Sequence, residues 1–132
     1  TVFPGTYKVS VQGSYSDLPN ANYVVNASLQ VTAATNGLTF NVVTVPISGV
    51  VTLNGAPPVD NGSCNDSYYF RGFVNLTDAT HGYSFSLPLR SCTGSATFSG
   101  EVFPGTYKVA VQGSYSDLPS ANDVVVRALV VN

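Results

Sequence analysis

The sequence predicts an all-β protein: a seven-stranded β-sandwich preceded by a two-strand segment that duplicates its C-terminal strands. Three observations predict this. Apolar and polar residues alternate with a period of two, and the apolar set is rich in Val, Tyr and Phe, which favour strands. Turn residues interrupt these runs every 8–12 residues or so, as in β-sandwiches. Finally, Val2–Val31 and Val102–Val131 align without a gap, and seven of the 30 aligned positions differ, which leaves 23 identities.

This duplication predicts the domain organisation. Self-similarity at a fixed period is typical of repeat arrays. We therefore expect residues 1–32 to be the C-terminal strand pair of a preceding repeat unit, and residues 33–132 to be a complete unit. Because two strands cannot bury their apolar face alone, the pair must dock on a partner chain, on a neighbouring unit of a polymer, or on the sandwich as extra strands. The expected docking residues are Tyr7, Val9, Val11, Val25, Leu29 and Val31.

Strands of the complete unit follow from the alternation. Tyr107 and Val109 fall on one face of their segment, and Tyr83 and Phe85 fall on one face of theirs, so these four are expected in the core. Pro104-Gly105 marks a turn that leads into a strand. The expected strands are 38–45, 47–54, 67–76, 82–89, 95–102, 105–113 and 123–131, with 6–13 and 23–31 in the first copy.

The differences between the two copies leave two interpretations open. Ala27 is replaced by Arg127, whereas Asn26 is replaced by Val126. Adjacent side chains of a strand point to opposite faces, so this exchange of polar and apolar character indicates that the copies have different neighbours. A one-residue bulge in one copy explains it equally well.

Composition excludes several classes of function. Charged residues make up 9% of the chain and the formal net charge is −2, so there is no basic footprint for nucleic acid or anionic lipid. No apolar run is long enough for a membrane span. Cys64 and Cys92 lack a nearby Cys or His, which favours a disulfide formed in an oxidising compartment over two buried free thiols. The sequence therefore predicts a secreted or cell-surface protein.

No catalytic constellation, cofactor motif or metal site is predicted. His81 is the only histidine and falls in an expected turn, where no Gly-x-Ser-x-Gly elbow accompanies it. Asp60, Asn61, Asp66 and Asp78 have oxygen ligands, but their spacing does not match a calcium loop and favours turn chemistry. Asp17 and Asp117 are interpreted as loop-closing Asx turns.

Aromatic residues offer one candidate binding site. Tyr and Phe suit interfaces because a flat apolar ring, with a polar tip in Tyr, packs well and bonds at its edge. Tyr68, Tyr69 and Phe73 form the possible patch, since alternation assigns other aromatics to the core. A glycan or a surface protein is the expected kind of ligand.

Two motifs carry a resemblance to a known family. The stretch Ser48 to Pro57, S-G-V-V-T-L-N-G-A-P, resembles the start of carboxypeptidase-regulatory-like β-sandwich domains. The stretches Y-S-F-S at Tyr83 and F-P-G-T-Y-K-V at Phe103 are similar to later strands of that family. The chain also resembles tandem repeats of large secreted or surface-anchored bacterial proteins. The resemblance implies a seven-stranded prealbumin-like or Ig-like sandwich that serves as a spacer, stalk or fibre subunit, and it does not imply an active site.

These observations lead to two functional hypotheses. The first is a non-enzymatic extracellular structural repeat that builds a stalk or filament, with copies of itself or adjacent repeat units as partners. Docking by strand addition would use backbone hydrogen bonds for affinity and alternate side chains for register. The alternative is an adhesin, or a carbohydrate- or protein-binding module of a surface protein, presenting the Tyr68–Phe73 face or the 60–66 loop.

Overall fold

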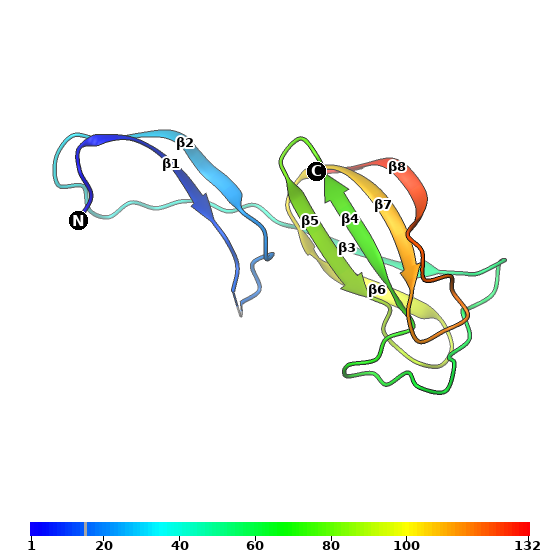
Figure 1. Cartoon of the computed structure of the whole chain (residues 1–132). Helices are drawn as coiled ribbons and strands as arrows, with labels where there is room; N and C mark the ends of the chain where they lie inside the picture. The colour runs from blue at the N-terminus through cyan, green and yellow to red at the C-terminus, as the bar shows by residue number, and fades with distance from the viewer. Residues whose placement is uncertain (15) are drawn as a thin grey trace.

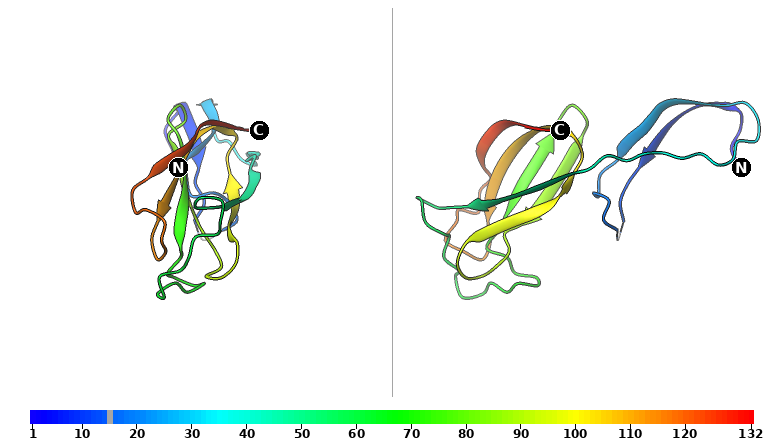
Figure 2. Two further views of the ribbon diagram at one scale, coloured as in Figure 1. Left: turned by 90° about the vertical axis from the view of Figure 1, so that its right-hand side faces the viewer. Right: turned by 180° about the vertical axis from the view of Figure 1, so that it is seen from behind.

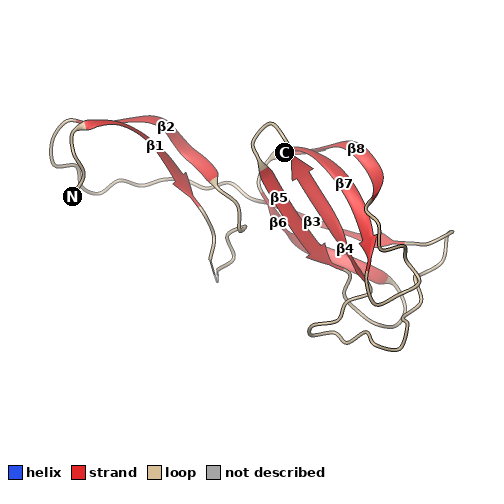
Figure 3. Ribbon diagram, in the orientation of Figure 1, coloured by secondary structure: helices blue, strands red, loops and turns tan. Residues whose placement is uncertain are grey.

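The computed structural model describes residues 1–14 and 16–132, and Tyr15 lies outside the described residues. The described chain is all β and has no helix that could cross a membrane (Figures 1 and 3). Its strands are β1 Gly5–Val11, β2 Tyr23–Val31, β3 Val45–Val51, β4 Gly72–Asp78, β5 Tyr83–Pro88, β6 Ala96–Val102, β7 Gly105–Gly113 and β8 Asp123–Val131.

Strands β3 to β8 form a two-layered sandwich. One layer is the antiparallel pair β3–β6, and the other is a four-stranded antiparallel sheet in the order β5-β4-β7-β8. The side chains that alternate inward from both layers form the core, as the period of two predicts. This confirms the predicted β-sandwich. The buried cluster consists of Val74, Leu76, Tyr83, Phe85, Leu89, Ala96, Val102, Phe103, Tyr107, Val109, Leu118 and Val131.

The sandwich contains fewer strands than expected. Residues 38–44 belong to none of the sheets, and β3 begins only at Val45. The expected strand 38–45 was inferred from alternation alone. A strand also needs a neighbouring backbone to complete its hydrogen-bond ladder, and β3 pairs with β6 from Val45 onward. Residues 38–44 instead form the end of the connection into the sandwich, where Val42 packs against the core cluster.

Strands β1 and β2 form a separate hairpin outside the sandwich (Figures 1 and 2). Residues 32–44 connect it to β3 by running back alongside the hairpin, so that the end of β1 and the beginning of β2 lie nearest the sandwich. At that end Ala21 and Tyr23 pack against the core cluster of the sandwich.

Both copies of the repeat contain the same irregularities. The register shifts between Tyr7 and Val9 and between Val9 and Ser10, and the equivalent shifts occur between Tyr107, Val109 and Ala110. A bulge restricted to one copy is therefore not the reason for the exchange at positions 26/126 and 27/127. The remaining interpretation is that the two copies have different neighbours.

Candidate interaction site

The hairpin β1–β2 has the local structure of β7–β8 in the sandwich. The hydroxyl of Tyr7 donates to the Phe3 carbonyl at 2.6 Å, and that of Tyr107 donates to the Phe103 carbonyl at 2.7 Å. The loops also match, because Gly13 N–H donates to the Pro19 carbonyl as Gly113 N–H does to that of Pro119. The repeated sequence therefore determines one local conformation in two different surroundings.

Burial of the two copies is very different. Phe103 is 1% exposed and Val102 is fully buried, whereas the equivalent Phe3 is 87% exposed and Val2 is 61% exposed. Tyr107, fully buried in the core, has only a half-buried counterpart in Tyr7. The predicted docking residues Tyr7, Val9, Val11, Val25, Leu29 and Val31 are all half-buried. Tyr7, Val9 and Val31 are thus more exposed than the buried residues at the equivalent positions of the second copy. The contrast does not extend to Val25, because the equivalent Val125 is 54% exposed.

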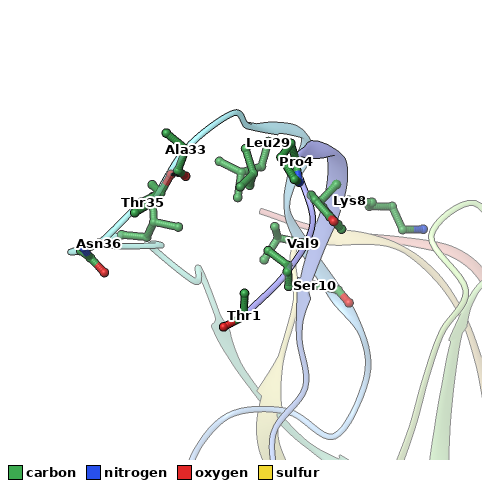
Figure 4. A pocket seen from close by; sticks show the side chains of 14 residues that line it. Thr1, Pro4, Lys8, Val9, Ser10, Leu29, Ala33, Thr35 and Asn36 are labelled. Atoms are coloured by element: carbon green, nitrogen blue, oxygen red, sulfur yellow. Dashed lines mark hydrogen bonds between the residues drawn. The ribbon is translucent and has the colours of Figure 1, made fainter.

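A groove of about 940 Å³ lies against the hairpin. Tyr7 and Val9 of β1 and Leu29 of β2 line one side, and the connection contributes Ala33 and Leu38 (Figure 4). Apolar side chains from both strands therefore face a space with no body of the sandwich in it.

One edge of β1 is also open. In the sandwich, β7 pairs with β8 on one side and with β4 on the other, from Gly72 opposite Gly113 to Thr77 opposite Lys108. Within the described part of the chain, β1 pairs with β2 alone. Its second row of backbone N–H and C=O groups has no strand beside it, which is the arrangement that favours strand addition.

The open edge keeps the features that bind a strand like β4. Asp78, at the end of β4, accepts a hydrogen bond from Thr106 N–H at 3.1 Å, and its carboxylate lies where a side chain at Gly105 would be. Thr6 and Gly5 repeat these two residues. A side chain at Gly5 would meet nothing nearer than the Tyr7 ring at 3.6 Å. The room for the carboxylate is therefore present and unfilled in the first copy.

The 112–122 loop corrects one interpretation. Asp117 does not close its own loop as an Asx turn. Its Oδ1 accepts from Val59 N–H at 2.8 Å and its own N–H donates to the Val59 carbonyl, so it ties two distant loops together. The local turn uses Ser116 Oγ, which accepts from Leu118 N–H. Asp117 and the equivalent Asp17 are both exposed.

The predicted disulfide is present. Cys64 and Cys92 are bonded, with 5.7 Å between their Cα atoms. Asp60 Oδ1 accepts from Cys64 N–H at 2.9 Å, and Asp66 Oδ1 accepts from Cys92 N–H at 3.0 Å. Asp60 therefore acts as a local turn acceptor, as predicted, whereas Asp66 joins its loop to the distant Cys92 and is not the turn acceptor that the sequence predicts. The bond points to an oxidising environment, where disulfides persist.

Two residues of the predicted aromatic patch pack against different rings outside it. Tyr69 packs against Tyr115 with ring centroids 4.9 Å apart, and Phe73 packs edge-on against Phe70 at 6.0 Å. Tyr68 is 81% exposed beside the disulfide-linked loop. Tyr68 and Tyr69 thus remain accessible on the loop, whereas Phe73 is a half-buried residue of β4.

His81 and Asp78 form a close pair in the β4–β5 turn. Nδ1 of His81 lies 2.7 Å from Asp78 Oδ2, and the Asp78 side chain is 1% exposed. The hydrogen bond from the His81 side chain, aided by three backbone N–H donors, lowers the Asp78 pKa from 3.8 to about 2. The His81 ring stacks on Tyr83 at 5.1 Å. The pair closes a turn, and among the described residues no cluster of three or more His, Cys, Asp or Glu side chains is placed to hold a metal ion.

Arg71 was not singled out from the sequence, yet it is the largest fully buried side chain. One of its terminal nitrogens donates to the Pro58 carbonyl at 2.6 Å and to the Gly94 carbonyl at 3.0 Å. It therefore joins the loop before β4 to the loop near the disulfide. A single Arg among aromatic residues carries no sequence signal for such a role.

Comparisons with protein-family models, curated proteins and solved structures found no significant match to this chain.

Proposed function

We propose that the chain is part of a non-enzymatic extracellular structural repeat that forms a stalk or filament by strand docking between units. Residues 1–32 are then the C-terminal strand pair of one unit, and residues 33–132 are the next. The sandwich body of the preceding unit, or of another copy, covers the hairpin β1–β2 as β3 to β6 cover β7 and the C-terminal end of β8.

One observation carries this proposal: the same eight residues, V-F-P-G-T-Y-K-V, form part of a core in one copy and lie open in the other. Exposed apolar faces and open strand edges of this kind are aggregation hazards unless they are covered. The unfilled space beside Gly5 supports the proposal, because the equivalent space at Gly105 holds the Asp78 carboxylate of the neighbouring strand.

The register of docking follows from the complete unit. A strand like β4 would run antiparallel to β1 with its Gly72 opposite Gly13 and its Leu76 opposite Val9, as the pairing with β7 has it. Its terminal aspartate would accept from Thr6 N–H. Affinity would come from the backbone ladder and from burial of the apolar face.

Hydrogen exchange tests the proposal directly. A two-unit protein is made by placing a copy of residues 32–101 immediately before Val2, and its amide exchange is compared with that of the original chain. We expect the amides of residues 5–13 to exchange rapidly in the original chain and as slowly as those of residues 105–113 in the two-unit protein. Unchanged exchange at residues 5–13 would reject strand docking. Electron microscopy of longer arrays should then show filaments with a regular axial repeat.

A binding module of a surface protein is the second candidate. The exposed Tyr68, with Tyr69 packed on Tyr115, favours it, because such rings suit contacts with sugars or proteins. Glycan-array binding that is lost in a Tyr68→Ala, Tyr69→Ala variant, with filaments absent by microscopy, would support this candidate over the first.

A further inference from the structure

The end of the sandwich that faces the hairpin carries an aromatic platform. Phe103 and Tyr83 lie with ring centroids 5.2 Å apart, and the His81 ring stacks on Tyr83 at 5.1 Å. Asp78 fixes this end, since it bonds both His81 and Thr106 N–H. The platform is thus held by the β4–β5 turn and by the beginning of β7.

Tyr23 of the preceding hairpin packs on this platform. Its ring centroid lies 4.7 Å from that of Phe103 and 6.5 Å from that of Tyr83, where the two rings are stacked. Ala21 packs against the same core cluster. Phe103, which is 1% exposed, is therefore buried partly by a residue from outside its own unit.

The equivalent residue in the second copy is of a different kind. Position 23 is one of the seven differences between the copies, and the second copy has Asp123 there. Asp123 is exposed, as is Ala121, whereas Tyr23 and Ala21 are half-buried. A carboxylate on an apolar platform of Phe and Tyr loses solvation without gaining a partner.

We infer that Tyr23 forms a joint between consecutive units, in which the hairpin of one unit completes the core of the next, and that the residue at this position decides whether the joint forms. The inference rests on the proposed function for its meaning, since it treats the hairpin as the end of a preceding unit. A tyrosine couples two units into one rigid pair. An aspartate leaves a following unit uncoupled at this contact.

Reciprocal variants of the full chain test the joint. Tyr23→Asp gives the first copy the residue of the second, and Asp123→Tyr is the matched control, because it makes the opposite change at a position that contacts no platform in the described chain. We expect Tyr23→Asp to lower the melting temperature of the sandwich by about 5 to 10 °C. The amides of residues 83–85 should exchange faster by about 5-fold or more. Asp123→Tyr should change neither, and Tyr23→Phe should retain the original behaviour.

Two outcomes would overturn the inference: unchanged exchange at residues 83–85 in Tyr23→Asp, or an equal loss in Asp123→Tyr. Either result leaves the exchange of residues 5–13 in the two-unit protein unaffected, so that failure of the joint is distinguishable from failure of strand docking. Conversely, residues 5–13 could exchange rapidly in the two-unit protein while Tyr23→Asp still destabilises the sandwich. That result would reject the repeat array but support the contact between Tyr23 and the platform.

Discussion

Truncation of the repeated phenylalanine gives the sharpest prediction, because the same substitution is made in the same eight-residue sequence at two places. Phe103 is 1% exposed and contacts Tyr83, Phe85 and Tyr23 through its ring, whereas Phe3 is 87% exposed. Truncating a buried Phe to Ala costs about 3 to 5 kcal/mol, whereas changes at exposed positions usually stay within about 0.5 kcal/mol. We expect Phe103→Ala to be severely destabilising and Phe3→Ala to be neutral.

Urea unfolding followed by circular dichroism measures this difference. With a slope of about 2 kcal/mol/M, a loss of 4 kcal/mol lowers the midpoint by about 2 M. If Phe103→Ala does not fold, Phe103→Leu gives a smaller loss of about 1 to 2 kcal/mol in the same direction. Equal midpoints for the Phe3 and Phe103 variants would refute the reasoning, because the two rings would then have equal surroundings. In the two-unit protein this difference should disappear, because Phe3→Ala should then lower the free energy of unfolding as much as Phe103→Ala does.

Three further predictions concern the complete unit. Replacing both Cys64 and Cys92 by Ala should lower the free energy of unfolding, measured by urea denaturation, by about 3–4 kcal/mol. The urea midpoint of this variant should no longer respond to reductant. The folded-state pKa of Asp78 lies below its ordinary value, so the contribution of this carboxylate to stability is complete above about pH 4 and is lost as the pH falls toward 2. Between pH 5 and pH 2 the melting temperature should therefore fall less steeply in Asp78→Asn than in the original chain. Parallel curves for the two proteins would disprove this role. Gly105→Ala should cost about 1 to 3 kcal/mol, because the new methyl group displaces the Asp78 carboxylate, whereas Gly5→Ala should be nearly neutral in thermal unfolding.

Local sequence patterns predicted the β-sandwich and much of its core. The strand 105–113 has the predicted bounds, and Tyr83, Phe85 and Tyr107 are buried as alternation requires. The period of two is sufficient here because each of these segments has a partner strand on at least one side. Residues 38–44 have the same kind of pattern without a partner, so the strand expected there is absent.

Contacts between distant segments were not predictable in the same way. Asp117 looked like a turn residue because its neighbours Ser116 and Pro119 are turn formers, and its bond to Val59 depends on how two loops meet in space. Arg71 and Tyr23 likewise act through residues far from them in sequence. The disulfide was predictable because two cysteines leave a single intramolecular pairing. The differing surroundings of the two copies were indicated by their substitutions, and the shared bulges removed the other explanation.

The pairing of Val45 with Val102 and of Gly105 with Val131 places the beginning of β3 and the end of β8 at one end of the sandwich. Both are edge strands of their layers. A pulling force applied through the chain would therefore load the hydrogen bonds of β3 and β8 one after another, in an unzipping geometry, and not all at once in a shear geometry.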